Sequence, residues 1–149
     1  MDTNQDSYDL VIDEDRHTYK FVSEGPRGKI QKVIAFKPIS GIEGYYNLSF
    51  GDWNEVMQKI NDSVVTNNLD TVKVLATVAQ AIDSFLAANP GAIIFASGRD
   101  PARNRLYRMS IQKYLGEIKN RFVLRGCCNK KWRPFKKGLD YDAFTLFRR

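Results

Sequence analysis

Apolar and polar residues alternate along the first third of the chain in short runs that turn-forming residues separate. The runs that are typical of strands cover residues 8–12, 18–22, 30–37 and 45–50. A charged turn at 13–17 joins the first two, and Pro38 ends the third, because proline cannot donate to a sheet ladder. The pattern predicts an antiparallel meander. The next stretch, 51–61, is ambiguous, because its apolar residues have helical spacing but the stretch is short.

Apolar residues then recur at three- and four-residue steps between Asp70 and Asn89, which is the period of a helix. We expect Asp70 to cap this helix by accepting backbone N–H bonds, and Asn89-Pro90-Gly91 to end it. A second long helix is predicted to start near Pro101. Its expected core stripe consists of Tyr107, Ile111, Tyr114, Leu115 and Ile118.

Four further strands are predicted around the second helix. They cover residues 92–96, 121–125, 127–133 and 141–147. The first is a short apolar run, and we expect it to be buried on both faces. The order of elements predicts an α+β fold, a mainly antiparallel sheet with two long helices packed on it.

The composition fits one soluble domain. The chain has 149 residues, of which 43% are hydrophobic and 27% charged, and we expect a single domain over 1–149 with a frayed start at 1–7. No apolar run approaches the ~20 residues that span a bilayer, and the first residues are acidic and polar. We therefore expect a cytoplasmic protein that does not engage a membrane.

Cysteine and histidine usage bears on catalysis and cofactors. Cys127 and Cys128 are adjacent, and a bridge between neighbours is strained, so we expect two reduced thiols. His17 is the sole histidine and lies in the predicted charged turn, where an exposed side chain is expected rather than a catalytic base. The chain has no spaced cysteine pair and no glycine-rich phosphate loop. We expect neither metal nor cofactor.

Charge is distributed unevenly along the chain. Residues 1–98 hold 8 Lys and Arg against 13 Asp and Glu, a net of −5, whereas residues 99–149 hold 15 against 4, a net of +11. Such a split is typical of proteins that bind nucleic acid or an acidic partner. The alternative is that the acidic half folds against the basic half and neutralises it.

Several segments match a known pattern in the same order. They include Tyr19-Lys-Phe-Val-Ser-Glu-Gly25, Gly28-Lys-Ile30, Tyr46-Asn-Leu-Ser-Phe-Gly-Asp52, Leu75-Ala-Thr-Val78, Ala96-Ser-Gly98, Pro101-Ala-Arg103, Arg105-Leu-Tyr107 and Phe135-Lys-Lys-Gly138. On these segments the sequence resembles a small bacterial family of unknown function with members of about this length. The resemblance covers nearly the whole chain and implies a stand-alone protein. It implies no activity, cofactor or substrate.

One candidate anion site lies where the strand at 92–96 gives way to the second helix. A helix N-terminus presents unpaired N–H groups and about half a positive charge. Arginines crowd this turn, although acidic residues would stabilise it better, which is expected where function overrides stability. The candidate residues are Ser97, Gly98, Arg99, Arg103, Arg105 and Tyr107. Alternatively, these arginines pair with acids of the N-terminal half, such as Glu24, Asp52 or Asp70.

A second candidate site is the basic stretch near 130. It covers residues 121–137, in which Lys130, Lys131, Arg133, Lys136 and Lys137 are interleaved with Trp132 and Phe135. Basic residues beside exposed aromatics suit single-stranded nucleic acid through charge attraction and base stacking. The alternative is a solvated hairpin with Trp132 packed on the core, because tryptophan is more often buried than displayed.

Three classes of function fit these features. The first is a non-enzymatic protein that binds nucleic acid or an acidic protein partner through its basic C-terminal half, and we favour it. The second is a metal-independent enzyme acting on a phosphate ester such as RNA, in which arginines would stabilise transition-state charge. The third is a structural or oligomerising protein, such as a homodimer or one component of a toxin–antitoxin-like pair.

Overall fold

The computed structural model describes residues 7–61, 66–97, 120–136 and 141–149, together with 105, 108–109, 111–113 and 116. Within these residues nine strands form one sheet, and one long helix packs on it. The elements are β1 (Val11–Ile12), β2 (Thr18–Gly25), β3 (Gly28–Pro38), β4 (Tyr45–Asn54), β5 (Lys59–Ile60), α1 (Thr71–Ala88), β6 (Ile93–Ser97), β7 (Phe122–Cys128), β8 (Lys131–Pro134) and β9 (Ala143–Arg148).

The sheet runs in the order β1-β2-β3-β4-β6-β9-β7-β8, and β5 pairs with β4 beside this path. The first four strands form the predicted antiparallel meander. β6 then pairs parallel with β4, because α1 carries the chain back across the sheet between them. β9 lies between β6 and β7, and both of these pairs are antiparallel. The fold is therefore α+β and dominated by antiparallel sheet.

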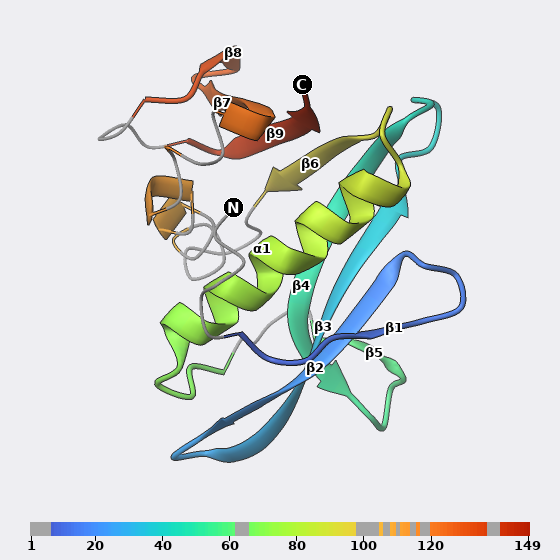
Figure 1. Cartoon of the computed structure of the whole chain (residues 1–149), viewed down its shortest axis with the longest axis vertical. Helices are drawn as coiled ribbons and strands as arrows, with labels where there is room; N and C mark the ends of the chain where they lie inside the picture. The colour runs from blue at the N-terminus through green and yellow to red at the C-terminus, as the bar shows by residue number, and fades with distance from the viewer. Residues whose placement is uncertain are drawn as a thin grey trace.

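α1 lies across one face of the sheet, and the core fills the space between them (Figure 1). Alternate residues of the strands point toward the helix, and Phe36 of β3 stacks on Phe85 of α1 with ring centroids 4.2 Å apart. Ile111 packs against the same core, and Arg121 contacts Asp83 of α1 at 2.8 Å. Ile111 and Arg121 therefore lie on the α1 side. We call the opposite side of the sheet the outer face.

The structure resolves one ambiguity, leaves one prediction unconfirmed and corrects another. Residues 51–54 end β4 and Lys59–Ile60 form β5, with a turn at 55–58 between them, so the ambiguous stretch is not helical. Two long helices are not confirmed: the described residues contain one, and the second predicted helix falls mostly outside them, although the described positions between 105 and 121 are helical. β6 is not buried on both faces, because Ile94 and Ala96 are buried while Ile93, Phe95 and Ser97 on the outer face are half-exposed.

α1 is long and apolar enough to cross a membrane by length and composition, with a mean hydropathy of 1.3. However, half of it is buried against the sheet, and the core helix of a soluble protein passes the same test. Its buried residues are Val74, Leu75, Ala76, Thr77, Val78, Ala79, Ala81, Phe85 and Leu86. We therefore assign α1 as the core helix of a soluble, sheet-dominated domain.

A tight turn joins β7 to β8, the last two strands at this edge of the sheet. Asn129 and Lys130 form this two-residue turn, and both have a positive φ, 52° and 62°, as a type I′ turn requires. Asparagine tolerates this conformation, whereas lysine rarely adopts it. Lys130 thus accepts an uncommon backbone conformation at the tip of the hairpin.

Candidate functional site

The outer face of β6, β9, β7 and β8 carries aromatic side chains. The strand register places Phe95, Thr145 and Arg125 side by side in one row across this face. The next row consists of Ser97, Ala143, Cys127 and Trp132. Because paired residues of neighbouring strands project to the same side, both rows face away from α1.

Trp132 and Phe95 meet on this face although they belong to strands separated by two others. Their ring centroids lie 6.0 Å apart at an interplanar angle of 63°, an edge-to-face contact. Ala143, on the strand pair between them, is only 7% exposed, whereas Trp132 is 45% exposed. The interpretation in which Trp132 packs on the core is therefore wrong, because the ring lies on the outer face with nearly half its surface in solvent.

A further row of half-buried side chains extends the apolar part of this face. It consists of Tyr45, Ile93, Phe147 and Val123. Sequence reasoning missed Phe95 and this row, and it did not single out Arg125 within the basic segment. The alternation along β6 and β9 is a usable signal for Phe95, Ile93 and Phe147, but only the strand register shows that they share one surface with Trp132.

Exposed basic side chains lie near the aromatic pair, on β7, β8 and the segments next to them. They are Arg125, Lys130, Lys131, Arg133 and Lys136. Within the described part of the chain, none of these five forms an ion pair. Lys131 and Arg133 pair with Cys128 and Gly126, so they project to the side of β8 opposite Trp132. We call Phe95, Arg125, Lys130 and Trp132 the basic aromatic surface. Figure 1 shows its outermost strand, β8, at the edge of the sheet.

The predicted anion site is described only in part. Ser97 lies on the outer face in the row of Trp132, and Arg105 is exposed and makes no ion pair with an acid that the structure describes. Gly98, Arg99, Arg103 and Tyr107 lie outside the described residues. Whether the site holds an anion stays a prediction.

The three acids considered as partners for these arginines are engaged elsewhere. Glu24 lies 3.9 Å from Lys29, and Asp52 is paired with Lys32. The carboxylate of Asp70 accepts bonds from the hydroxyls of Tyr8 and Ser23. Among the described residues, the basic aromatic surface is therefore not neutralised by the acidic N-terminal half.

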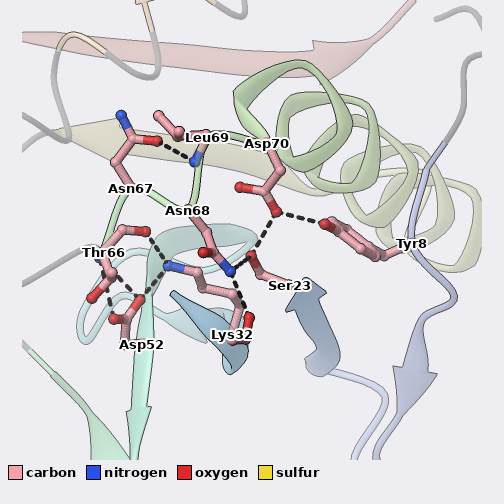
Figure 2. A network of polar contacts seen from close by, with 10 residues as sticks. Tyr8, Ser23, Lys32, Asp52, Thr66, Asn67, Asn68, Leu69 and Asp70 are labelled. Atoms are coloured by element: carbon pink, nitrogen blue, oxygen red, sulfur yellow. Dashed lines mark hydrogen bonds and ion pairs between the residues drawn. The ribbon is translucent and has the colours of Figure 1, made fainter. Parts of the chain in front are cut away.

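A buried polar network fixes the segment before α1 to the sheet (Figure 2). Lys32 of β3 is only 1% exposed, and its ammonium group bonds the carboxylate of Asp52 on β4 and, at 2.8 Å, the carbonyl oxygen of Thr66. The amide of Thr66 donates back to the Asp52 carboxylate at 3.2 Å. The charge of a buried lysine is thus compensated by an ion pair and hydrogen bonds, as burial requires.

Asn68 joins this segment to the β2–β3 hairpin. Its side-chain amide donates to Ser23 Oγ at 3.2 Å and to the Gly28 carbonyl at 2.9 Å, and its side-chain oxygen accepts the Arg27 amide at 2.7 Å. Gly25 lies so close that a Cβ there would stand 2.8 Å from the Asn68 side chain. Only glycine fits this position without displacing the segment.

Asp70 does not cap α1 in the predicted way. It occupies the N-cap position, but its carboxylate makes no hydrogen bond to the helix and instead accepts the Tyr8 and Ser23 hydroxyls, each at 2.6 Å. Burial and the bond to Asp70 together raise the pKa of the Tyr8 phenol. The carboxylate therefore ties the N-terminal segment to the helix start, and this requirement outweighs the local capping preference.

This network is suited to holding structure rather than to chemistry. Lys32, Ser23 and Asn68 are inaccessible to solvent, so a substrate does not reach them. His17 is half-buried rather than exposed, and its ring packs edge-on against Tyr46 and Phe85. In the part of the chain that the structure covers, no three His, Cys, Asp or Glu side chains gather as a metal site needs. The basic aromatic surface is the accessible candidate.

Comparison with known proteins places the chain in a family. The sequence model of a family of unknown function, DUF6934, matches residues 4–149, and the chain belongs to this family. No curated protein and no solved structure matches the chain.

Proposed function

We propose that this member of the DUF6934 family binds single-stranded nucleic acid on its basic aromatic surface without cleaving it. The observation that supports this most is Trp132, which is 45% exposed and lies on Phe95 at the outer face. Exposed aromatic rings on a sheet are stacking platforms for unpaired bases. A duplex would hide its base faces from such rings.

The cations around the rings fit the backbone of the same strand. Arg125 shares the outer face with Phe95, and Lys130 lies in the turn two residues before Trp132. Cations that lack acidic neighbours attract phosphates and release their counterions. This combination favours nucleic acid over an acidic protein partner, because an acidic protein would use the charges but not the exposed ring.

Replacing Trp132 by alanine is expected to weaken binding of a labelled oligonucleotide of about 12 nucleotides by about 5- to 150-fold, since stacking one base contributes about 1–3 kcal/mol. Fluorescence anisotropy in the presence of chelator measures the affinity. Trp132 is at the edge of the sheet, so the variant should keep its fold. Trp53→Phe is the matched control, and it leaves Trp132 as the sole tryptophan, whose fluorescence should be quenched on binding.

Three outcomes would contradict this proposal. Equal affinity of Trp132→Ala for the oligonucleotide would exclude stacking. Tight binding of heparin, a polyanion without bases, with no dependence on Trp132 would indicate an acidic partner instead. Shortened oligonucleotide on a denaturing gel, at a rate that the charge-removing variants below reduce, would show an enzyme rather than a binding protein.

The basic residues are expected to govern the salt dependence of binding. For single strands, the slope of log affinity against log salt changes by about 0.7 for each phosphate contact. Replacing Arg125 by glutamine and Lys130 by asparagine together should therefore reduce this slope by about 1.4. The double variant of Lys29 and Lys59, two exposed lysines outside the surface, removes the same charge and should leave the slope nearly unchanged. Equal slopes for the two double variants would contradict phosphate contacts on the basic aromatic surface.

A further inference from the structure

The opposite edge of the sheet has a second accessible feature, the unpaired end of β2. The Phe36 amide bonds the His17 carbonyl at 2.8 Å, and the Asp13 amide bonds the Thr18 carbonyl at 2.9 Å. Odd-numbered residues of β2 therefore direct their backbone groups to β3, and even-numbered ones direct them to β1. β1 pairs only with Tyr19 and Lys20, so Val22 and Glu24 lie beyond its end.

The chain leaves the sheet before it could pair with this part of β2. The backbone amide of Tyr8 bonds Thr77 of α1 at 2.9 Å, which turns Tyr8 toward the core. The Tyr8 ring stacks on Phe21, with centroids 5.5 Å apart, and its hydroxyl accepts the Glu24 amide at 3.0 Å. The Tyr8 hydroxyl thus accepts the hydrogen bond from the Glu24 amide, which a neighbouring strand would otherwise accept.

Val22 is left with an open edge. Among the described residues no group bonds its outward N–H or C=O, and the residue is 44% exposed. Val22 lines a pocket of about 440 Å³, within the roughly 300–1,000 Å³ of small-ligand sites. Its lining includes Tyr8, Val11, Lys20, Val22, Glu24 and Lys73.

We propose that this pocket binds an uncharged extended peptide, which adds to the edge of β2 through the backbone of Val22. One residue of an added peptide strand can bond both free groups of the edge residue, because its C=O accepts from the N–H and its N–H donates to the C=O. Val11 and Val22, which are 64% and 44% exposed, offer an apolar surface to one side chain.

The charges that line the pocket fit an uncharged ligand. Lys20 is 3.6 Å from Asp13 and lies over the Trp53 ring, and Glu24 lies near Lys29. Lys73 lies over the Tyr8 ring at 4.4 Å. The lining also includes Asp9, which is exposed and forms no ion pair with a described residue, so an anionic ligand is disfavoured. The exposed Asp9 charge is screened by water, and the other charges have partners, so an uncharged ligand meets no penalty. This site lies on the edge of the sheet opposite β8, and the inference does not depend on the proposed nucleic-acid binding.

The test uses the full chain and the blocked pentapeptide acetyl-Thr-Val-Thr-Val-Thr-amide. Titration with the peptide at millimolar concentration should shift the Val22 and Glu24 amide resonances and slow hydrogen exchange of the Val22 amide. The same peptide with every backbone nitrogen methylated lacks the donor and should bind at least about tenfold more weakly. Equal binding of both peptides, or no shift at Val22, would overturn the proposal.

A protein variant gives an independent check. Val22→Pro removes the one outward N–H, and proline is tolerated on edge strands where that N–H is unpaired. Peptide affinity should fall at least about tenfold while the melting temperature and oligonucleotide binding stay close to those of the parent. Unchanged peptide affinity in this variant would overturn the proposal, whereas a variant that fails to fold leaves the methylated peptide as the deciding comparison.

Discussion

Replacing Lys32 by methionine is expected to lower the free energy of unfolding by about 3–5 kcal/mol, which corresponds to a fall in Tm of about 10 °C. Lys32 is 1% exposed and is the cation that compensates the Asp52 carboxylate on the neighbouring strand. Without it, a largely buried carboxylate has no counter-charge and the Thr66 carbonyl loses its donor. Urea unfolding followed by circular dichroism measures the loss.

The double variant Lys32→Met, Asp52→Leu shows whether the loss of stability comes from an uncompensated charge or from the packing of the side chains. Exchanging a whole buried ion pair for apolar residues is often neutral, so the double variant should recover most of the stability lost in the single one. The Thr66 amide still loses its acceptor, so recovery stays incomplete by about 1 kcal/mol. Lys29→Met, on an exposed side chain of the same strand, is the control. A single variant as stable as this control would contradict the assignment of the network as structural.

The N-terminal half of the fold could be predicted from the sequence because its order is local. The alternation along β2 and within β4 specifies one buried face, the apolar run at 33–36 predicts a strand, and Gly25 to Gly28 specifies a tight hairpin. The helical spacing of apolar residues in α1 and its end at Asn89 could likewise be predicted, since both depend on neighbouring residues. Lys32 was not recognised, because its partners lie 20 and 34 residues further along the chain.

The C-terminal half depends on pairings between distant segments. β9, the last strand, inserts between β6 and β7, so the strand order does not follow the order in the sequence. This insertion places Arg125 in one row with Phe95 across β9. Composition identified Trp132 and the lysines beside it, but it did not show which face the ring would occupy. Only the register decides whether Trp132 joins the core or the outer face.

β7 carries Arg125 on its outer side, and its position depends on close packing on its inner side. The Tyr141 ring lies against Gly126, and a Cβ on this glycine would stand 2.6 Å from one ring carbon and 2.7 Å from another. Tyr141 is 1% exposed, contacts Phe135 and Phe144, and accepts the Lys136 amide at 2.9 Å. The ring is therefore held on several sides and has little room to move.

Replacing Gly126 by alanine is accordingly expected to destabilise the protein by about 3 kcal/mol and to weaken oligonucleotide binding, because β7 must shift away from Tyr141 and carry Arg125 with it. Urea unfolding and fluorescence anisotropy measure the two effects. Gly91→Ala is the matched control, since a Cβ there meets nothing within 4 Å. Adding Tyr141→Leu makes room for the new methyl group and should restore part of the binding. If Gly126→Ala behaved like Gly91→Ala in both measurements, the packing of Tyr141 would not position the basic aromatic surface.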